Sequence, residues 1–483
     1  MEVAVSVRRT SAMLTCAALL VAGQLVAASP VLGAQADGCG DSGGAPLRYL
    51  VVFDRGTAES AATSEILAAC GAPTIYYPEI AVAVATSADR DFADRLSTGR
   101  AFSAQRERLR SGTGAPRERL DRLGAAAVPT ADRTAEQWNM RAINAELARA
   151  VDRGSRDVVV GVLDSGIDPD HPDLAAALAP DLSAGCLTGA PDRDRAAWEP
   201  TTSPHGTHVA GTIAAADDGR GVTGVAPGVR LASVKVVDDH GRVDPEAVVC
   251  GFLWAARNGL AVTNSSYAVD SWSPSCGEGG GHAVAREAVT RAVAHADAAG
   301  TLNVAAATNT ATNLTPVPRA VARSAGGGGT PGGHCAALPA GLREVVTVSA
   351  VTERGVKAGY SSYGLGAIDL AAPGGDAGRC VLSTVPGGYA SLCGTSMAAP
   401  HVAGVAALLA STRPHHAPRR LRQALAAGAL PVPCPADYDL TGNGTQDAYC
   451  AGYTAYNGFY GHGLVDALAA VSPAQPARPV PVR

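Results

Sequence analysis

The sequence predicts an α/β protein with a mostly parallel central sheet covered by helices on both faces, preceded by a small α/β unit. From about residue 138, apolar runs such as DVVVGVL, RLASVKVV and REVVTVSAV alternate with longer stretches of helical pattern. These runs are also apolar almost throughout, which is typical of parallel strands buried on both faces. The length of this region suits one domain of roughly three hundred residues.

The small unit is predicted from the pattern of residues 47–97. LRYLVVF predicts a strand, SAATSEILAAC a short helix, TIYYPEIAVAVAT a pair of strands and DRDFADRL a second helix. An arginine-rich stretch follows, and its SGTGAP segment interrupts any regular element. Alternating Arg and Glu are more typical of a solvated surface than of a basic helix that binds a partner. We therefore expect the small unit within residues 37–100 and a linker over residues 101–136.

The two ends of the chain have the composition of processing and tail segments. Arg8 and Arg9 precede an apolar run that small residues follow, which predicts a secretory signal peptide over residues 1–36. A membrane anchor is the alternative, but Gly, Gln and Ser-Pro interrupt the run and it is short for a span. The proline-rich residues 472–483 predict a tail. We expect a secreted protein that has no membrane association once the signal is removed.

Composition narrows the class of partner. Hydrophobic residues make up 47% of the 483 residues and charged residues 17%, as in a globular protein. The net charge of −5 argues against nucleic acid or an anionic membrane as the principal partner.

The cysteines predict disulfides. The chain has 11 cysteines, and Cys16 lies in the predicted signal, which leaves an even set for an oxidising compartment. Metal binding is the alternative, but no CxxC pair occurs. The segment CVLSTVPGGYASLC has the pattern of a hairpin that turns at Pro386 and Gly387, which would place Cys380 opposite Cys393.

Three polar residues stand where an α/β fold builds its sites. An apolar strand ends at Asp164, at the carboxyl edge of the predicted sheet. His205 lies where a loop becomes a helix, and Ser396 lies at the start of another, where it is either a helix cap or a nucleophile in the field of the helix dipole. An Asp, a His and a Ser can form the relay in which an oriented imidazole takes the serine proton. A metal pair of His205 and His208 is disfavoured, because the segment lacks the HExxH glutamate and a third ligand.

The segments around these residues resemble a known family. VVVGVLDSGID, HGTHVAGTIAA and GTSMAAPHVAG, in that order, are similar to the signature blocks of the subtilisin-like serine proteases, the subtilases. The resemblance covers residues 137–471 and implies the three-layer subtilisin-like fold of a serine endopeptidase that acts through an acyl-enzyme. It implies that Asp164 orients the base, that His205 is the general base and that Ser396 is the nucleophile. An α/β-hydrolase esterase is disfavoured, because its chain order is Ser, Asp, His.

The resemblance also implies binding residues. The family places an asparagine in the oxyanion hole, and NVAAATNT puts Asn309 there, with Thr308 in place of the usual glycine. The segment NSSY resembles the wall of the specificity pocket and implies substrate binding by Ser266, Tyr267 and Ala268, the last of these where the family tends to have glycine. Thr308 leaves open an alternative, an extracellular binding protein on a subtilase fold with impaired catalysis.

The remaining expectations concern partners and cofactors. The small unit resembles the pro-segment of the family, a chaperone and inhibitor that self-cleavage removes. The implied partners are protein or peptide substrates and the chain's own pro-segment, and we expect a monomer. The chemistry requires no cofactor and no metal. Subtilases often bind structural calcium, and oxygen donors gather in a loop that the sequence predicts to be closed by a disulfide between Cys434 and Cys450 rather than by an ion: Asp439, Thr441, Asn443 and Asp447.

Overall fold

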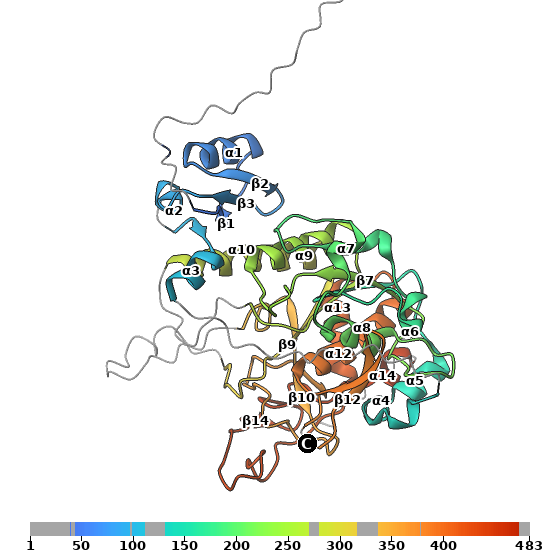
Figure 1. The fold of residues 1–483 in the computed structure, drawn as a ribbon. Helices are drawn as coiled ribbons and strands as arrows, with labels where there is room; N and C mark the ends of the chain where they lie inside the picture. The colour runs from blue at the N-terminus through green and yellow to red at the C-terminus, as the bar shows by residue number, and fades with distance from the viewer. Residues whose placement is uncertain are drawn as a thin grey trace, which may run out of the picture.

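The computed structural model describes residue 39 and residues 44–96, 99–111, 131–269, 280–315, 337–376 and 378–472. The predicted signal peptide, most of the predicted linker and nearly all of the tail lie outside these residues. The described chain forms a small N-terminal unit and a larger domain, with the small unit seated on one side of the larger (Figure 1). Within the described ranges, no helix combines the length and apolarity needed to cross a membrane.

A seven-stranded parallel sheet forms the centre of the larger domain and confirms the predicted fold class. Its strand order is β11-β10-β9-β8-β5-β7-β6, and every neighbouring pair is parallel. The strands are β5 (Val159–Asp164), β6 (Ala184–Gly185), β7 (Arg230–Lys235), β8 (Val262–Ser265), β9 (Leu302–Ala306), β10 (Val345–Val351) and β11 (Leu370–Pro373).

Helices cover both faces of this sheet. Strand β5 is apolar throughout because its side chains enter a hydrophobic core on each face. Val160 and Val162 belong to one hydrophobic core, whereas Val159 and Leu163 belong to the other. Successive side chains of a strand point to opposite faces, so both faces are buried. The first core lies under α4 (Trp138–Ala142), α5 (Ala145–Val151), α8 (His205–Ala214), α12 (Thr395–Thr412), α13 (Pro418–Gly428) and α14 (Ala467–Val471). The second lies under α9 (Pro245–Arg257) and α10 (Gly280–Ala298).

Shorter elements complete this domain. They include η1 (Thr134–Glu136), α6 (Pro172–Ala175), η2 (Pro180–Leu182) and α7 (Arg195–Trp198). Two antiparallel hairpins follow the sheet, β12 (Val381–Val385) with β13 (Gly388–Leu392) and β14 (Gly452–Tyr453) with β15 (Tyr456–Asn457).

The N-terminal unit is an antiparallel sheet of order β2-β3-β1-β4 with three helices. Residues 101–111, which the sequence assigned to the linker, form β4 and α3, because Phe102 pairs with Leu50 of β1 and Gln105 accepts a hydrogen bond from the backbone of Arg48 at 2.8 Å. The elements are β1 (Leu47–Val52), α1 (Glu59–Ala68), β2 (Ala72–Tyr77), β3 (Val82–Ser87), α2 (Phe92–Arg95), β4 (Ala101–Phe102) and α3 (Ala104–Ser111).

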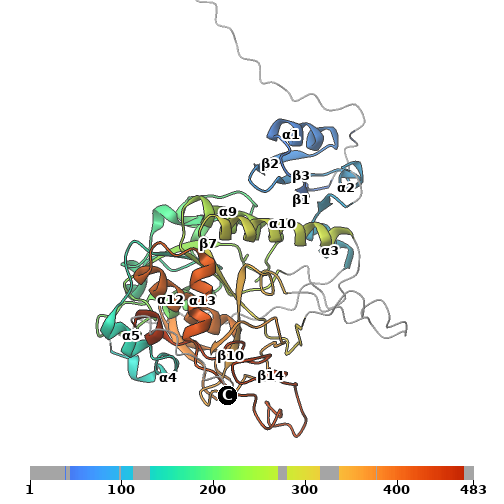
Figure 2. The ribbon, with the colours of Figure 1, turned by 180° about the vertical axis from the view of Figure 1, so that it is seen from behind.

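One face of the small sheet packs on α9 and α10, as both views of the ribbon show (Figures 1 and 2). Leu50 and Val84 share a hydrophobic core with residues of α9, whereas Tyr49 and Val51 face the other way, toward the small unit's own core. The hydroxyl of Tyr77 donates to the carbonyl oxygen of Gly189 at 2.6 Å, which adds a polar contact.

Ion pairs surround this apolar contact. Arg48 bonds the buried carboxylate of Glu246 at 2.8 Å, and Arg108 makes two hydrogen bonds to Asp244 at 2.6 and 3.1 Å. At another point of the interface Arg257 pairs with Glu79 at 2.9 Å. The small unit is therefore held by apolar burial and by charge complementarity together.

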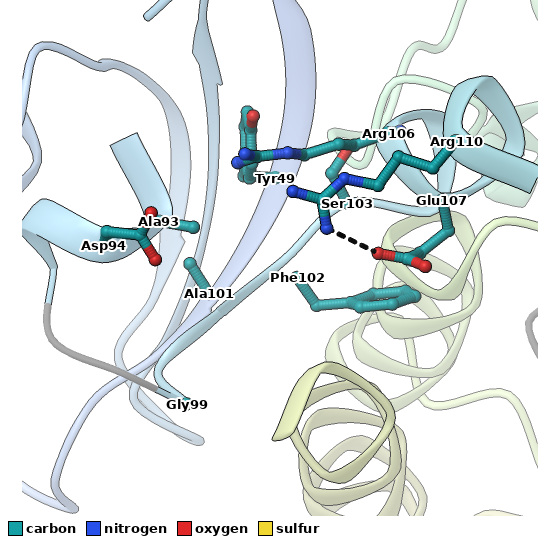
Figure 3. Close-up of a pocket in the computed structure, with 10 residues that line it drawn as sticks. All are labelled: Tyr49, Ala93, Asp94, Gly99, Ala101, Phe102, Ser103, Arg106, Glu107 and Arg110. Atoms are coloured by element: carbon teal, nitrogen blue, oxygen red, sulfur yellow. Dashed lines mark hydrogen bonds and ion pairs between the residues drawn. The ribbon is translucent and has the colours of Figure 1, made fainter. Parts of the chain in front are cut away.

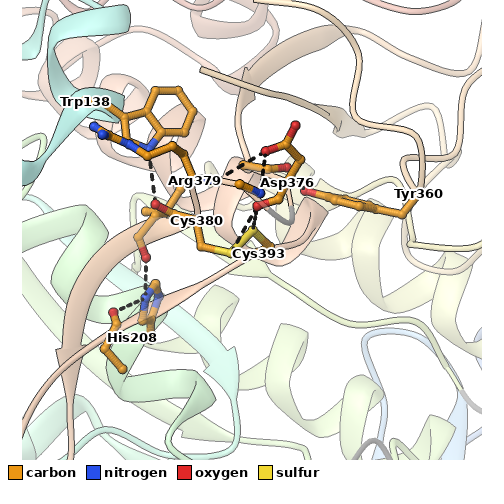
Figure 4. Close-up of a disulfide and its surroundings, with 11 residues drawn as sticks. Trp138, His208, Tyr360, Asp376, Arg379, Cys380 and Cys393 are labelled. Carbon is orange, nitrogen blue, oxygen red and sulfur yellow. Dashed lines mark hydrogen bonds between the residues drawn. A yellow bond between two sulfur atoms is a disulfide. The ribbon is translucent and has the colours of Figure 1, made fainter. Parts of the chain in front are cut away.

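The predicted hairpin bridge is formed. Cys380 and Cys393 are bonded across β12 and β13 (Figure 4). The strand register puts the turn at Pro386 and Gly387. The indole Nε1 of Trp138 donates to the carbonyl oxygen of Cys380 at 3.1 Å and ties this bridge to α4. The other described bridges are Cys39–Cys70, Cys186–Cys250 and the expected Cys434–Cys450. Cys276 and Cys335 lie outside the described residues.

Replacing Cys380 and Cys393 together by serine should lower stability by about 3 kcal/mol, because the bridge constrains the unfolded chain. Thermal unfolding measures this loss. The double substitution Cys434→Ser and Cys450→Ser removes a disulfide that closes a loop of similar size and serves as the control. Only the first pair should speed amide hydrogen exchange in residues 381–392, and peptide mapping that joined Cys380 to any other cysteine would contradict the expectation.

Candidate active site

Asp164 and His205 meet at the carboxyl end of β5. Asp164 is the last residue of the strand and is fully buried, and its Oδ1 accepts the Nδ1 hydrogen of His205 at 2.8 Å. His205 is the first residue of α8, and its side chain is 22% exposed, so one edge of the ring reaches the surface. A Cβ on the next residue, Gly206, would come within 2.4 Å of the carbonyl oxygen of Gly166. Only glycine lets this helix begin so close to the turn that follows Asp164.

Ser396 does not cap its helix. Gly394 occupies the N-cap position of α12, and Ser396 is the second helical residue. Its hydroxyl donates to the carbonyl oxygen of Ser266, at 2.9 Å, instead of accepting from a backbone N–H of the first turn. The capping interpretation was therefore wrong, and Ser396 lies at the positive end of a long buried helix with its hydroxyl turned toward the end of β8.

Asn309 is fixed against the start of α12. Its Oδ1 accepts hydrogen bonds from the backbone N–H of Thr395 at 2.9 Å and from the Thr395 hydroxyl at 2.8 Å. A Cβ on Gly394 would lie 3.2 Å from Nδ2 of Asn309, so the donor side of the amide faces the turn before Ser396. Two nearby asparagines are used elsewhere, since Asn303 accepts from Thr263 inside the sheet and Asn313 accepts from the backbone of Thr315.

Thr308 keeps the backbone shape that a glycine would adopt. Its φ is 81°, in the left-handed region where a side chain costs about 1–2 kcal/mol. Two contacts offset this strain: the Thr308 and Ser362 hydroxyls lie 2.8 Å apart, and the backbone N–H of Ser362 donates to the Thr308 carbonyl at 3.0 Å. The departure from the family pattern thus leaves Asn309, the next residue, oriented toward α12.

The segment after β8 brings one of its three expected residues to Ser396. Ser266 and Ser396 are joined by reciprocal hydrogen bonds, because the Ser266 hydroxyl also donates to the Ser396 carbonyl at 2.8 Å. Tyr267 is half-buried and packs against the core under α9, and burial raises the pKa of its hydroxyl. Ala268 is also half-buried. The structure thus joins Ser266 directly to the candidate nucleophile and places Tyr267 and Ala268 beyond it along the chain.

The other histidines near the site have structural partners. His208 is buried, its Nε2 donates to the carbonyls of Val381 and Ala390, and burial lowers its pKa to about 3 (Figure 4). His401 lies between the Asn139 amide and the Met397 carbonyl, each at 2.8 Å, and burial lowers its pKa to about 4. Both rings are therefore neutral at physiological pH.

Candidate metal ligands and the pocket of Figure 3 lie away from this site. In the part of the chain that the structure describes, no three His, Cys, Asp or Glu side chains group so that they could hold a metal ion. In the loop closed by Cys434 and Cys450, Asp439 accepts from the backbone of Asn443 and Gly444, and Asp447 accepts from Thr441. The pocket in Figure 3, lined by residues such as Tyr49 and Arg106, belongs wholly to the N-terminal unit.

Comparison with known sequences assigns the chain that forms this site to a protein family. Residues 155–463 match the sequence model of the subtilase family. The chain belongs to the subtilase family. It is 35% identical to subtilisin DY of Bacillus licheniformis over 288 residues, which are 59% of this chain and 89% of that protein. It is 34% identical to alkaline elastase YaB of a Bacillus species over 337 residues, 69% of each chain. From its family and these relatives, this subtilase is a serine endopeptidase of the subtilisin type.

Solved structures agree on the fold. The epidermin leader peptide processing serine protease of Staphylococcus aureus aligns with a TM-score of 0.62 at 20% identity, over 89% of this chain and all of that chain. A lanthipeptide protease aligns with a TM-score of 0.54 at 25% identity, over 71% of this chain and 99% of that chain. The first of these likenesses is a likeness of fold alone, and it extends over most of the described subtilase chain.

The free energy of unfolding should fall as the pH drops from 6.5 toward 4. His208 and His401 have folded pKa values below the ordinary value of about 6.5, so the unfolded chain binds protons first and stability is lost on acidification. Each contributes up to about 1.4 kcal/mol per pH unit in this range. Denaturant unfolding with a serine-protease inhibitor present measures the slope, which His401→Gln should reduce. If His401→Gln and the wild type had the same slope, His401 would bind its proton equally well in the folded and the unfolded chain.

Proposed function

We propose that this subtilase is a secreted endopeptidase in which Asp164, His205 and Ser396 form the catalytic triad. The observation that carries the proposal is the 2.8 Å hydrogen bond from His205 Nδ1 to the buried Asp164 carboxylate, at the sheet edge where α12 presents Ser396. A buried carboxylate bonded to Nδ1 holds the imidazole in the tautomer whose Nε2 can accept a proton. The substrates are proteins or peptides.

These positions support the following chemistry, in which the Ser396 hydroxyl turns from the Ser266 carbonyl to His205 Nε2. His205 takes the proton of Ser396 as its oxygen attacks the substrate carbonyl carbon, and Asp164 stabilises the imidazolium that forms. The carbonyl oxygen becomes an anion that Asn309 Nδ2 stabilises together with the backbone N–H of Ser396, which has no intrahelical acceptor at the second position of α12. His205 then protonates the leaving amine, and water hydrolyses the acyl-enzyme by the same steps. Every group comes from the chain, so no cofactor takes part.

Casein hydrolysis and labelling by a fluorophosphonate test this proposal. The wild-type protein should show both, because a fluorophosphonate reacts with an activated serine. Ser396→Ala should show neither. The second candidate function, an extracellular binding protein with impaired catalysis, rests on the strain at Thr308. It would be supported by a folded wild-type protein that neither hydrolyses casein nor becomes labelled.

The oxyanion role of Asn309 has a measurable signature. Asn309→Leu should lower kcat by about 10²–10³ with little change in KM, because the amide stabilises the transition state more than the bound substrate. Steady-state kinetics on a peptide anilide measure both constants. Asn313→Ala is the matched control and should keep kcat within a few-fold. An unchanged kcat in the Asn309 variant would remove Asn309 from the oxyanion hole.

We also infer that the chain is made as a zymogen. The N-terminal unit is consistent with a pro-segment, and its contact with α9 and α10 supports this assignment. The proposed order is a signal over residues 1–36, the pro-segment over 37–100 continued through β4 and α3 to Ser111, a processing region in the rest of 101–136, the peptidase over 137–471 and a tail over 472–483. The peptidase then acts as a monomer outside the cell, with its own pro-segment as its first partner.

Ser396→Ala should be secreted with its pro-segment still covalently attached, because self-cleavage uses the same serine. Intact mass spectrometry of the variant from a protease-deficient host gives the N-terminus directly. The wild-type protein from the same host is the control and should begin after the processing region. A normally trimmed Ser396→Ala would show that another protease makes the cut.

A further inference from the structure

The helix that carries Ser396 lacks one of its own hydrogen bonds. In a regular α-helix the N–H of residue 400 donates to the carbonyl oxygen of residue 396. Residue 400 is Pro400, which lies inside α12 and has no N–H to donate. The carbonyl of Ser396 is therefore left without its intrahelical donor, at the residue whose position matters most for attack.

A side chain from the sheet replaces the missing donor. The hydroxyl of Ser266 donates to the Ser396 carbonyl oxygen at 2.8 Å, and the Asn264 amide donates to the Ser266 hydroxyl at 2.8 Å. Ser266 is 3% exposed and Asn264 is fully buried, so water does not compete for these bonds. A serine hydroxyl has one hydrogen, and the donation from Asn264 commits that hydrogen to Ser396.

We propose that the Ser266 hydroxyl, oriented by Asn264, positions the nucleophile by replacing the hydrogen bond that Pro400 removes. The inference rests on the proposed role of Ser396 as nucleophile. The chain Asn264, Ser266, Ser396 ties the first turn of α12 to the end of β8, next to β5 and Asp164. Ser266 touches no reacting atom through its hydroxyl and is a positioning residue.

The expected effect lies in kcat. Without the hydroxyl, the Ser396 carbonyl has no donor and the first turn of α12 can shift, and a displacement of about 1 Å at a reacting group costs on the order of 10²-fold in rate. A substrate that binds through other contacts is held as before. Ser266→Ala should therefore lower kcat by about 10–10²-fold and leave KM within about three-fold.

Restoring the helix hydrogen bond should rescue the loss. Pro400→Ala supplies the N–H of residue 400, so in this background Ser266→Ala should change kcat by less than about three-fold. The control is Ser411→Ala, which removes a serine hydroxyl that bonds a carbonyl of the same helix, that of Ala407 at 2.8 Å, far along α12 from Ser396. It should leave kcat unchanged. A purely stabilising role for Ser266 would lower the melting temperature without this Pro400-dependent change in kcat.

The experiment measures kcat and KM on a peptide anilide for the wild type, Ser266→Ala, Pro400→Ala and the double variant, with active sites counted by fluorophosphonate. A Ser266→Ala enzyme with wild-type kcat would overturn the inference alone, as would a loss that Pro400→Ala fails to restore. If Ser266→Ala is not recovered folded, recovery of active enzyme by Pro400→Ala supports the inference and failure to recover it overturns it. A wild type without turnover would overturn the proposed function itself.

Discussion

Burial of both faces of the parallel sheet is the constraint on which the rest of the subtilase structure depends. Because helices cover each face, every crossover returns the chain to the same end of the sheet, and all strands finish at one edge. Asp164, Ser265 and Ala306 end three adjacent strands there. The polar residues that follow them are therefore brought together without any local signal linking them, and the two helices that begin at this edge supply His205 and Ser396.

Two irregular backbone positions shape the candidate active site at this edge of the sheet. Thr308 adopts a left-handed conformation that turns Asn309 toward α12, and the Ser362 hydroxyl and backbone hold it there. Pro400 removes a hydrogen bond from α12 close to the nucleophile, and Ser266 replaces it from the sheet. In both cases a local defect is compensated by a group from another element. The first turn of α12 is thereby joined to β8 and β9 by directed bonds as well as by packing.

The fold and the candidate triad could be predicted because each depends on local pattern. Strands that are apolar almost throughout, a strand that ends at Asp164 and a small-residue helix that starts near Ser396 can each be recognised within a few residues of sequence. The capping interpretation failed because Gly394, two residues earlier, occupies the N-cap, and sequence does not separate these positions. The link from Ser266 to Pro400 joins residues 134 positions apart in sequence, so only the tertiary structure reveals it. The first part of the linker was misassigned because β4 is a two-residue strand whose pairing with β1 is non-local.

The contact between the small unit and the larger domain pairs acidic groups at the start of α9 with arginines of the small unit. Glu246 lies in the first turn of α9, and burial raises its pKa, while Arg48 opposes that shift by pairing with the ionised form. Burying this carboxylate has a desolvation cost that only a well-placed cation offsets. On the proposed release of the small unit, Glu246 and Asp244 would lose these arginines and would keep their position at a helix N-terminus, where negative charge is stabilised by the helix dipole. Arg48 and Arg108 therefore offset the cost of burying these carboxylates in the contact, and in the proposed mature enzyme the dipole of α9 would take over that role.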